Sequence, residues 1–269
     1  MAEGTGNKSG KGCQVSAPTR IQAEFTRQAE TLAAAAVFTD TDVLARILAQ
    51  VAPSQAMTVL DVGCGPGILA AALAPWAGKV VGLDVTPKMV ESARARCRTA
   101  GLTNVHCALG QAETLPFAEG TFAAVVTRAT LHHVPEPGKV LREMARVVRG
   151  GGRVVVADIS ASEDPAAAAV HNALEVLRDP SHVRMLSASE LQREIQAAGL
   201  RVLTTSAWDM SRTFEEWMQI TNAPERAGPL CTLMRALANA GVRAGIDLQE
   251  SGETVRFTHR WCLVAAERG

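Results

Sequence analysis

The chain lacks a net charge, because its 27 lysine and arginine residues equal its 27 aspartate and glutamate residues. No long-range field therefore favours nucleic acid or an anionic membrane, and a small neutral or lipophilic substrate fits better than a polyanion. The sequence also has no apolar run of the roughly 18 residues that cross a bilayer, and no charged-then-apolar leader. We expect a cytoplasmic protein with no nucleic-acid partner and no membrane insertion.

Paired cysteine motifs are absent too. The six cysteines form no C-x-x-C pair, so the spacing of a zinc site is missing. Several lie in apolar segments, where a free thiol behaves as a small hydrophobe. We expect no bound metal, and unpaired, reduced thiols at Cys13, Cys64, Cys97, Cys107, Cys231 and Cys262.

The length and composition favour one domain. A chain of 269 residues with 47% hydrophobic content can bury a sizeable core, and α/β chains of this length are commonly single domains with insertions. Residues 1–17 are rich in glycine and polar side chains, and hold too little apolar surface to offset the entropy of ordering. We expect a disordered tail there and one folded domain over residues 18–269.

Apolar segments of strand length alternate with helical patterns along the chain, which predicts parallel pairing with helices on both faces of a doubly wound α/β sheet. An alanine-rich helical region, residues 18–52, precedes the sheet and is expected to cover its open edge as a lid. Residues 161–186 and 209–252 break the alternation, and we expect them to form a cap inserted before the last strand. The seven expected strands lie near 57–62, 79–84, 104–109, 121–127, 152–158, 200–207 and 254–265.

A glycine-rich turn is the most informative local feature. The apolar run from Val59 ends at Asp61 and passes into three glycines, Gly63, Gly65 and Gly67. Glycine has no Cβ, so a bulky ligand can approach the main chain there. A strand-to-helix turn can also need glycine without any ligand, and that alternative stays open.

The next apolar strand ends at Asp84, and a carboxylate at such a strand end can accept both hydroxyls of a ribose. The glycine spacing is G-x-G-x-G, whereas a dinucleotide fold wants G-x-G-x-x-G, and Pro66 stiffens the loop. The sequence therefore predicts a nucleoside-containing ligand that is not a dinucleotide. The alternative for Asp84 is a carboxylate that caps the helix after Thr86.

These motifs resemble those of the class I S-adenosylmethionine-dependent methyltransferases. Residues 61–67 resemble motif I of that family, and residues 82–89 resemble the acidic segment that follows it. Further segments are similar, in order and spacing, to the subgroup of ubiquinone and menaquinone C-methyltransferases: 110–117, 131–133, 143–153 and Asp158. The resemblance implies a Rossmann-like fold with a cofactor-binding core over residues 53–160, S-adenosyl-L-methionine as cofactor and S-adenosyl-L-homocysteine as product.

The resemblance also assigns cofactor contacts. Asp61 would orient the glycine loop and help, through water, to hold the methionine ammonium near Gly63 and Gly65. Val85 and Met89 would sandwich the adenine, although a methionine one turn into a helix is more often core. The turn formed by Gln111, Ala112 and Glu113 would read the adenine amino group, since the Gln111 amide oxygen can accept a hydrogen bond.

Three further residues complete the expected site. Arg128 follows the fourth strand, where the family places contacts to the methionine moiety; a salt bridge to an exposed neighbour is the alternative. Phe25, with Phe38, would close over the cofactor as part of the lid. His133 is the catalytic candidate, a hydrogen-bond donor or general base with a pKa near the working pH; a structural histidine that fixes the loop is the alternative.

The implied activity is methyl transfer to carbon or oxygen of a small lipophilic or aromatic metabolite. Alternatives are an N-methyltransferase of specialised metabolism, or a protein that keeps the cofactor without transferring methyl groups, such as a cyclase or a sensor. Several apolar side chains of the cap could line the acceptor site or simply pack the cap's own core: Met185, Trp208, Met210, Phe214, Trp217 and Met218.

Overall fold

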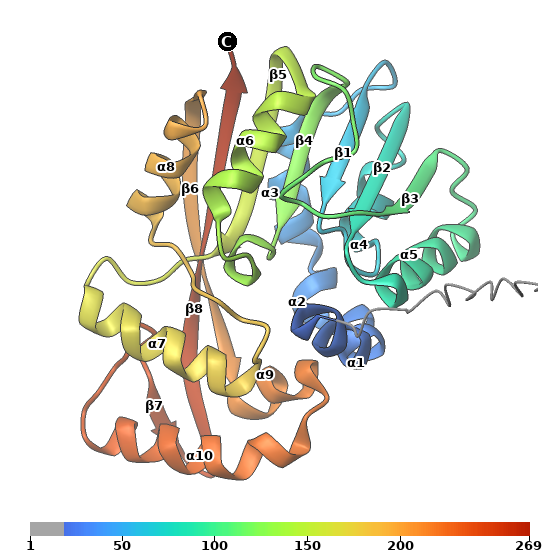
Figure 1. Ribbon diagram of the computed structural model, residues 1–269. Helices are drawn as coiled ribbons and strands as arrows, with labels where there is room; N and C mark the ends of the chain where they lie inside the picture. The colour runs from blue at the N-terminus through green and yellow to red at the C-terminus, as the bar shows by residue number, and fades with distance from the viewer. Residues whose placement is uncertain (1–18) are drawn as a thin grey trace, which may run out of the picture.

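A computed structural model describes residues 19–269, so the expected tail, residues 1–17, lies outside the described part of the chain. The described residues form an eight-stranded sheet flanked by helices (Figure 1). Its strands are β1 (Thr58–Val62), β2 (Lys79–Asp84), β3 (Val105–Leu109), β4 (Phe122–Arg128), β5 (Val148–Ile159), β6 (Leu200–Thr213), β7 (Gln249–Ser251) and β8 (Thr254–Arg268). The helices are α1 (Arg20–Ala34), α2 (Ala36–Thr39), α3 (Thr41–Val51), α4 (Ile68–Leu73), α5 (Pro87–Thr99), α6 (Pro137–Val147), α7 (Pro165–Arg178), α8 (Ala188–Ala197), α9 (Phe214–Thr221) and α10 (Pro224–Asn239), with a 3₁₀ helix, η1, at Leu131–His133.

The strand order is β3-β2-β1-β4-β5-β8-β6, with β7 paired to β8. Strands β1 to β5 pair in parallel, and β8 runs antiparallel to both β5 and β6. The expected Rossmann-like, mostly parallel α/β fold is confirmed. The expected number of seven strands is wrong by one, because β7 pairs with the part of β8 that extends into the cap.

Alternation along β1 builds two cores, one on each face of the sheet. Leu60 packs into a core that includes residues of α6 and α8, whereas Val59 packs with residues of α3 and α4. Helix α3 joins this layer through Val43, Ile47 and Val51, which recur at the spacing of one helical face. The expected lid over residues 18–52 therefore divides: α3 covers a face of the sheet and not its open edge, and only α1 and α2 lie beneath the carboxyl ends of the strands (Figure 1).

The cap is built on the long ends of β6 and β8. Both strands continue past the parallel sheet, and α7, α9, α10 and β7 gather around their extensions (Figure 1). Residues 209–213, expected in the cap insertion, are part of β6. The cap has its own core, separate from the two on the faces of the sheet, which contains Leu174, Phe214, Trp217, Met218, Leu230 and Met234.

The apolar cap residues expected near the acceptor mostly pack other residues. Phe214 and Met218 lie in the cap core, and Trp208 stacks on Trp261 with ring centroids 5.8 Å apart. Of the six, only Trp217 lines the cavity that contains the glycine loop, described below.

No described helix combines the length and apolar character that a membrane span requires. The cysteines of the described chain, Cys64, Cys97, Cys107, Cys231 and Cys262, are unpaired, as expected; Cys13 lies outside the described residues.

Candidate active site

The glycine loop between β1 and α4 adopts left-handed backbone conformations. Gly63, Gly65 and Gly67 have φ values of +69°, +51° and +76°. A Cβ at Gly63 would collide with Thr130, and one at Gly67 would lie 2.8 Å from the Cβ of Ala93. At Gly65 no atom lies within 4 Å of that position. Gly63 and Gly67 are therefore required by packing as well, and Gly65 is where a ligand can approach the bare main chain.

Asp84 holds this loop from the end of β2. Its Oδ2 accepts a hydrogen bond from the Gly65 N–H at 2.9 Å, and its Oδ1 accepts one from the Thr86 N–H at 2.8 Å. The Thr86 side chain makes no capping bond, so Asp84 performs part of the capping role named above as its alternative. Each carboxylate oxygen keeps acceptor capacity for a ribose hydroxyl. Burial raises the pKa of Asp84.

Asp61 is a buried carboxylate without a complete set of partners. Its side chain lines the cavity, and its Oδ2 has no hydrogen-bond partner among the described residues. Burial, and next the proximity of Cys107, raises the pKa of Asp61 to about 7. Backbone bonds from Gly63 and Cys64 to the Leu83 carbonyl, together with Asp84, hold the loop that Asp61 was expected to orient. The unpaired oxygen leaves Asp61 free to accept a bond from a ligand.

Arg128 connects the sheet to the lid. Its guanidinium donates to the Phe38 and Val37 carbonyls at 2.8 and 2.9 Å and lies over the rings of Phe38 and Trp261. The side chain is buried, so the alternative of a salt bridge to an exposed neighbour is wrong. Arg128 fixes α2 beside the cavity.

One cavity of about 360 Å³ joins the glycine loop to the cap. Val85 and Met89 line one end of it with the turn after β3, Gln111–Glu113. Met89 is also fully buried, so it serves the core as well as the cavity wall. Of the site residues expected from the sequence, those that line this cavity are Phe25, Asp61, Gly63, Gly65, Asp84, Val85, Met89, Gln111, Ala112, Glu113, Arg128 and His133; Gly67 does not.

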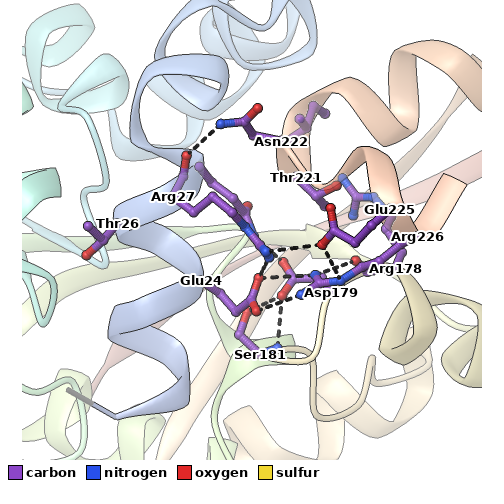
Figure 2. A network of polar contacts seen from close by, with 12 residues as sticks. Glu24, Thr26, Arg27, Arg178, Asp179, Ser181, Thr221, Asn222, Glu225 and Arg226 are labelled. Atoms are coloured by element: carbon purple, nitrogen blue, oxygen red, sulfur yellow. Dashed lines mark hydrogen bonds and ion pairs between the residues drawn. The ribbon is translucent and has the colours of Figure 1, made fainter. Parts of the chain in front are cut away.

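Helix α1 lines the cavity and is held by hydrogen bonds at several points along its length. Gln22 donates to the Val85 carbonyl at 3.0 Å beside the β2 end, and Gln28 donates to Asp179 at 2.8 Å on the cap side. Figure 2 shows Glu24 directed toward Arg226 of α10, which donates two hydrogen bonds of 3.0 and 3.2 Å to it. Helix α1 thus contacts both the end of β2 and the cap.

His133 belongs to a relay of three side chains. The Ser181 Oγ donates to Asp179 at 2.6 Å and lies 3.1 Å from His133 Nδ1. A hydroxyl has one proton, so Ser181 accepts from Nδ1–H and leaves Nε2 with its lone pair. Burial, and next the charge of His132, lowers the pKa of His133 to about 3. The expectation of a pKa near the working pH is wrong, and His133 is a neutral acceptor there.

His132 forms a second, charged pair that the sequence reasoning missed. Its Nδ1 lies 2.5 Å from Asp158 Oδ1, and both side chains are buried. Burial alone would lower the pKa of His132, but Asp158 raises it overall; in return, His132 outweighs burial and lowers the pKa of Asp158. Asp158 also accepts the Leu131 N–H at 2.9 Å, which fixes η1. The signal was present in the sequence, because Asp158 ends β5 and η1 follows the adjacent β4.

A further buried cluster lies in the cap. Ligand-type atoms of His171, Glu175 and His259 all lie within 4.8 Å of one another. Glu175 already accepts hydrogen bonds from Trp217 Nε1 and from Arg178, both at 3.1 Å. These donors occupy the carboxylate that a cation would need, so the absence of a metal stays our prediction for this cluster.

The comparisons with known proteins agree with this geometry. The methyltransferase-domain family model matches residues 60–156. The methyltransferase YcgJ of Bacillus subtilis (strain 168), itself uncharacterized, is 32% identical over 242 residues, which are 89% of this chain and 96% of that protein. Its crystal structure superposes with a TM-score of 0.79 over 84% of this chain and 98% of its own, at 30% identity.

Two relatives have named activities. The demethylmenaquinone methyltransferase of Clavibacter sepedonicus is 31% identical over 63% of this chain and 66% of its own. The ubiquinone biosynthesis O-methyltransferase of Paracidovorax citrulli (strain AAC00-1) is 32% identical over 57% of this chain and 67% of its own. The extent of the match to YcgJ and the shared fold show that this chain belongs to the class I S-adenosylmethionine-dependent methyltransferases.

Proposed function

We propose that this enzyme transfers the methyl group of S-adenosyl-L-methionine to carbon or oxygen of a small lipophilic or aromatic metabolite. The observation that carries the proposal is the continuity of one cavity from the Asp84–Gly65 cradle to a wall of apolar cap residues and His133. A positively charged sulfonium makes its methyl group electrophilic, so the protein's task is to position the acceptor and exclude water.

The residues divide this task along the cavity. Asp84 would bind the ribose hydroxyls, and Asp61, whose Oδ2 lacks a partner, would accept a bond from the methionine ammonium, directly or through water. Val85 and Met89 would contact the adenine, and the Gln111 side chain would accept from its amino group. Each of these groups lines the cavity.

His133 would hold the acceptor's hydroxyl or acidic C–H through Nε2. When the bond from sulfur to methyl breaks and the bond from the acceptor to methyl forms, the acceptor loses one proton. Nε2 would take that proton, and Asp179, hydrogen-bonded through Ser181, would stabilise the imidazolium that results. Phe25 packs edge-on against the His133 ring at 4.7 Å and would keep water from it.

The test is incubation with methyl-labelled cofactor and a panel of phenols, quinones and amines. Label in a phenol or quinone supports the proposal, whereas label confined to amines indicates an N-methyltransferase. Tight cofactor binding by calorimetry without labelled product across the panel would indicate a protein that keeps the cofactor without transferring methyl groups, such as a cyclase or a sensor. Stabilisation by NAD and not by S-adenosyl-L-homocysteine would overturn the cofactor assignment.

A further inference from the structure

Arg212, at the end of β6, is a buried cation without a partner. Its side chain is 7% exposed, and its Nε has no hydrogen-bond partner among residues 19–269. Among the same residues, no carboxylate oxygen lies within 4.0 Å of the Arg212 guanidinium nitrogens, so Arg212 forms no ion pair there. The nearest acidic groups act on it only at longer range and are engaged elsewhere: Glu175 with Arg178, and Glu216 with the Thr213 N–H. A buried charge in this state costs free energy unless something binds it.

The β6–β8 ribbon directs Arg212 into the substrate cavity. Arg212 pairs with Phe257, Met210 with His259, and Trp208 with Trp261, so all six side chains share one face of the ribbon. Arg212, His259 and Trp261 all line the cavity that holds the glycine loop. The unpaired guanidinium therefore borders the space left for the acceptor.

The same face offers two more polar groups without hydrogen bonds. Trp261 Nε1 is buried and unpartnered among the described residues, and His259 Nε2 lies 3.1 Å from Glu175 Oε1 without the alignment of a hydrogen bond. Burial lowers the pKa of His259 to about 4, so its imidazole is neutral at physiological pH. Arg178, which also lines the cavity, is paired with Glu175, whereas Arg212 has no ion-pair partner among residues 19–269.

We propose, resting on the methyltransferase function above, that the acceptor is a lipophilic carboxylic acid whose carboxylate binds Arg212 at the cap end of the cavity. One unpaired guanidinium matches a monoanion, and a planar guanidinium pairs with a carboxylate through two parallel hydrogen bonds. Asp179, which accepts the Ser181 hydroxyl beside His133, also lines the cavity and repels a carboxylate from the neighbourhood of His133. The charges thus orient the acid with its reactive group toward His133.

The geometry also sets the size of the acceptor. Phe257 lies opposite Arg212 in the ribbon and is four residues along β8 from Trp261. The Arg128 guanidinium lies over the Trp261 ring. Four residues of strand span about 13 Å. An acceptor that extends from Arg212 along this strand toward Trp261 is therefore longer than a single ring, with an apolar body that contacts Trp217 and Ile220.

The test is binding to enzyme saturated with S-adenosyl-L-homocysteine, measured by calorimetry. The probes are 4-phenylbutyrate and decanoate, each compared with its primary amide, and decyl phosphate. We expect each acid to bind about tenfold or more tightly than its amide, because a charge-assisted bond is replaced by a neutral one. Arg212→Met should abolish this preference and leave the affinity for the cofactor product unchanged, and Arg256→Met, an exposed arginine on β8, should change neither.

Equal affinities of acid and amide, or no saturable binding of the acids at millimolar concentration, would overturn the proposal. Tighter binding of decyl phosphate that depends on Arg212 would overturn the carboxylate assignment. Arg212→Gln provides a second variant that keeps polarity without charge, and should lose the preference as Arg212→Met does. Failure of the protein to bind the cofactor product would instead count against the proposed function, so the two results are distinguishable.

Discussion

At the scale of single residues, the site depends on side chains that perform a structural and a binding task at once. Asp84 holds Gly65 and Thr86 through their N–H groups and still offers acceptor capacity to the cavity. Sequence reasoning treated capping and ribose binding as alternatives, but a carboxylate has about four lone-pair sites and can do both. Substitution at such a position therefore affects loop geometry as well as affinity.

Replacing Asp84 by alanine should weaken binding of S-adenosyl-L-homocysteine by about 1.5–3 kcal/mol, because hydrogen bonds to a charged acceptor are lost. Isothermal calorimetry measures the affinity, and thermal unfolding without ligand measures the separate cost to the loop. Glu91→Gln, on the exposed side of α5, is the control and should leave both unchanged. An unaltered affinity in Asp84→Ala would refute the ribose role.

Replacing His133 by alanine should lower kcat by about 10²-fold with little change in cofactor affinity, since a positioned base contributes in this range. Ser181→Ala tests the relay separately. It removes the acceptor of Nδ1–H, so it should lower kcat and shift the pH profile while leaving the histidine in place. Single-turnover kinetics would separate the chemical step from product release, and full activity in His133→Ala would reduce this residue to a scaffold role.

At the scale of elements, we propose that α1 acts as a lid, because it contacts both the end of β2 and the cap. Gln22 bonds the carbonyl beside the β2 end, while Glu24 and Gln28 bond the cap. The Glu24–Arg226 pair is well shielded, since the two side chains are 11% and 20% exposed. A shielded pair with two hydrogen bonds stabilises the closed lid more than a surface pair would.

Glu24→Gln should weaken closure by about 1 kcal/mol, which corresponds to roughly fivefold faster release of the cofactor product. Stopped-flow displacement measures the release rate, and limited trypsin digestion near Arg20 and Arg27 reports lid opening. Glu225→Gln is the matched control, because Glu225 is 64% exposed and lies at the rim of the same network. Equal effects of the two variants would show that the contact between Glu24 and Arg226 does not control the lid.

At the scale of the whole molecule, buried histidines make stability depend on pH. Burial lowers the pKa of His133 to about 3 and the pKa values of His182 and His259 to about 4. As the pH falls below about 6.5, these histidines bind protons in the unfolded chain but stay neutral in the folded protein. The free energy of unfolding therefore decreases as the pH falls. Asp61 has the opposite effect. Its pKa is raised to about 7, so below that pH it holds one proton in the folded state that it releases on unfolding.

His132 contributes with the opposite sign. Its pKa is raised in the folded protein, so the stability from its pair with Asp158 is present below about pH 6.5 and is lost as the pH rises through the folded pKa of His132. On unfolding below pH 6.5, the three histidines whose pKa values are lowered each bind a proton, whereas Asp61 releases one. The net uptake is therefore roughly two protons.

The free energy of unfolding should therefore fall by about 2 kcal/mol per pH unit between about pH 6 and pH 5. Urea titrations at a series of pH values measure this slope. In His182→Gln the chain should take up about one proton fewer on unfolding, because residue 182 no longer titrates in the unfolded chain. The dependence of the free energy of unfolding on pH should therefore be weaker. A free energy of unfolding that increases as the pH falls from 6 to 5 would contradict the neutral state of these histidines.

The sequence by itself determined the αβ sandwich, the glycine loop and the position of Asp84 beside that loop. These depend on local information, because apolar periodicity sets each element, and a glycine turn between a strand and a helix places Gly65 and Asp84 at neighbouring strand ends. Its errors concerned the extent and the packing of elements, such as the extra strand β7 and the role of α3, because these depend on what each segment contacts in the fold.

Only the tertiary structure brought together the residues of the proposed acceptor site. Trp261 and His259 from β8, Arg212 from β6, and the Ser181–Asp179 relay come from segments far apart in the chain. Their protonation and pairing depend on burial and on neighbours that no local pattern encodes, as the low pKa of His133 demonstrates. Strand periodicity could have placed Arg212 on the inner face of β6, but only the folded contacts of residues 19–269 reveal that its charge lacks a partner there.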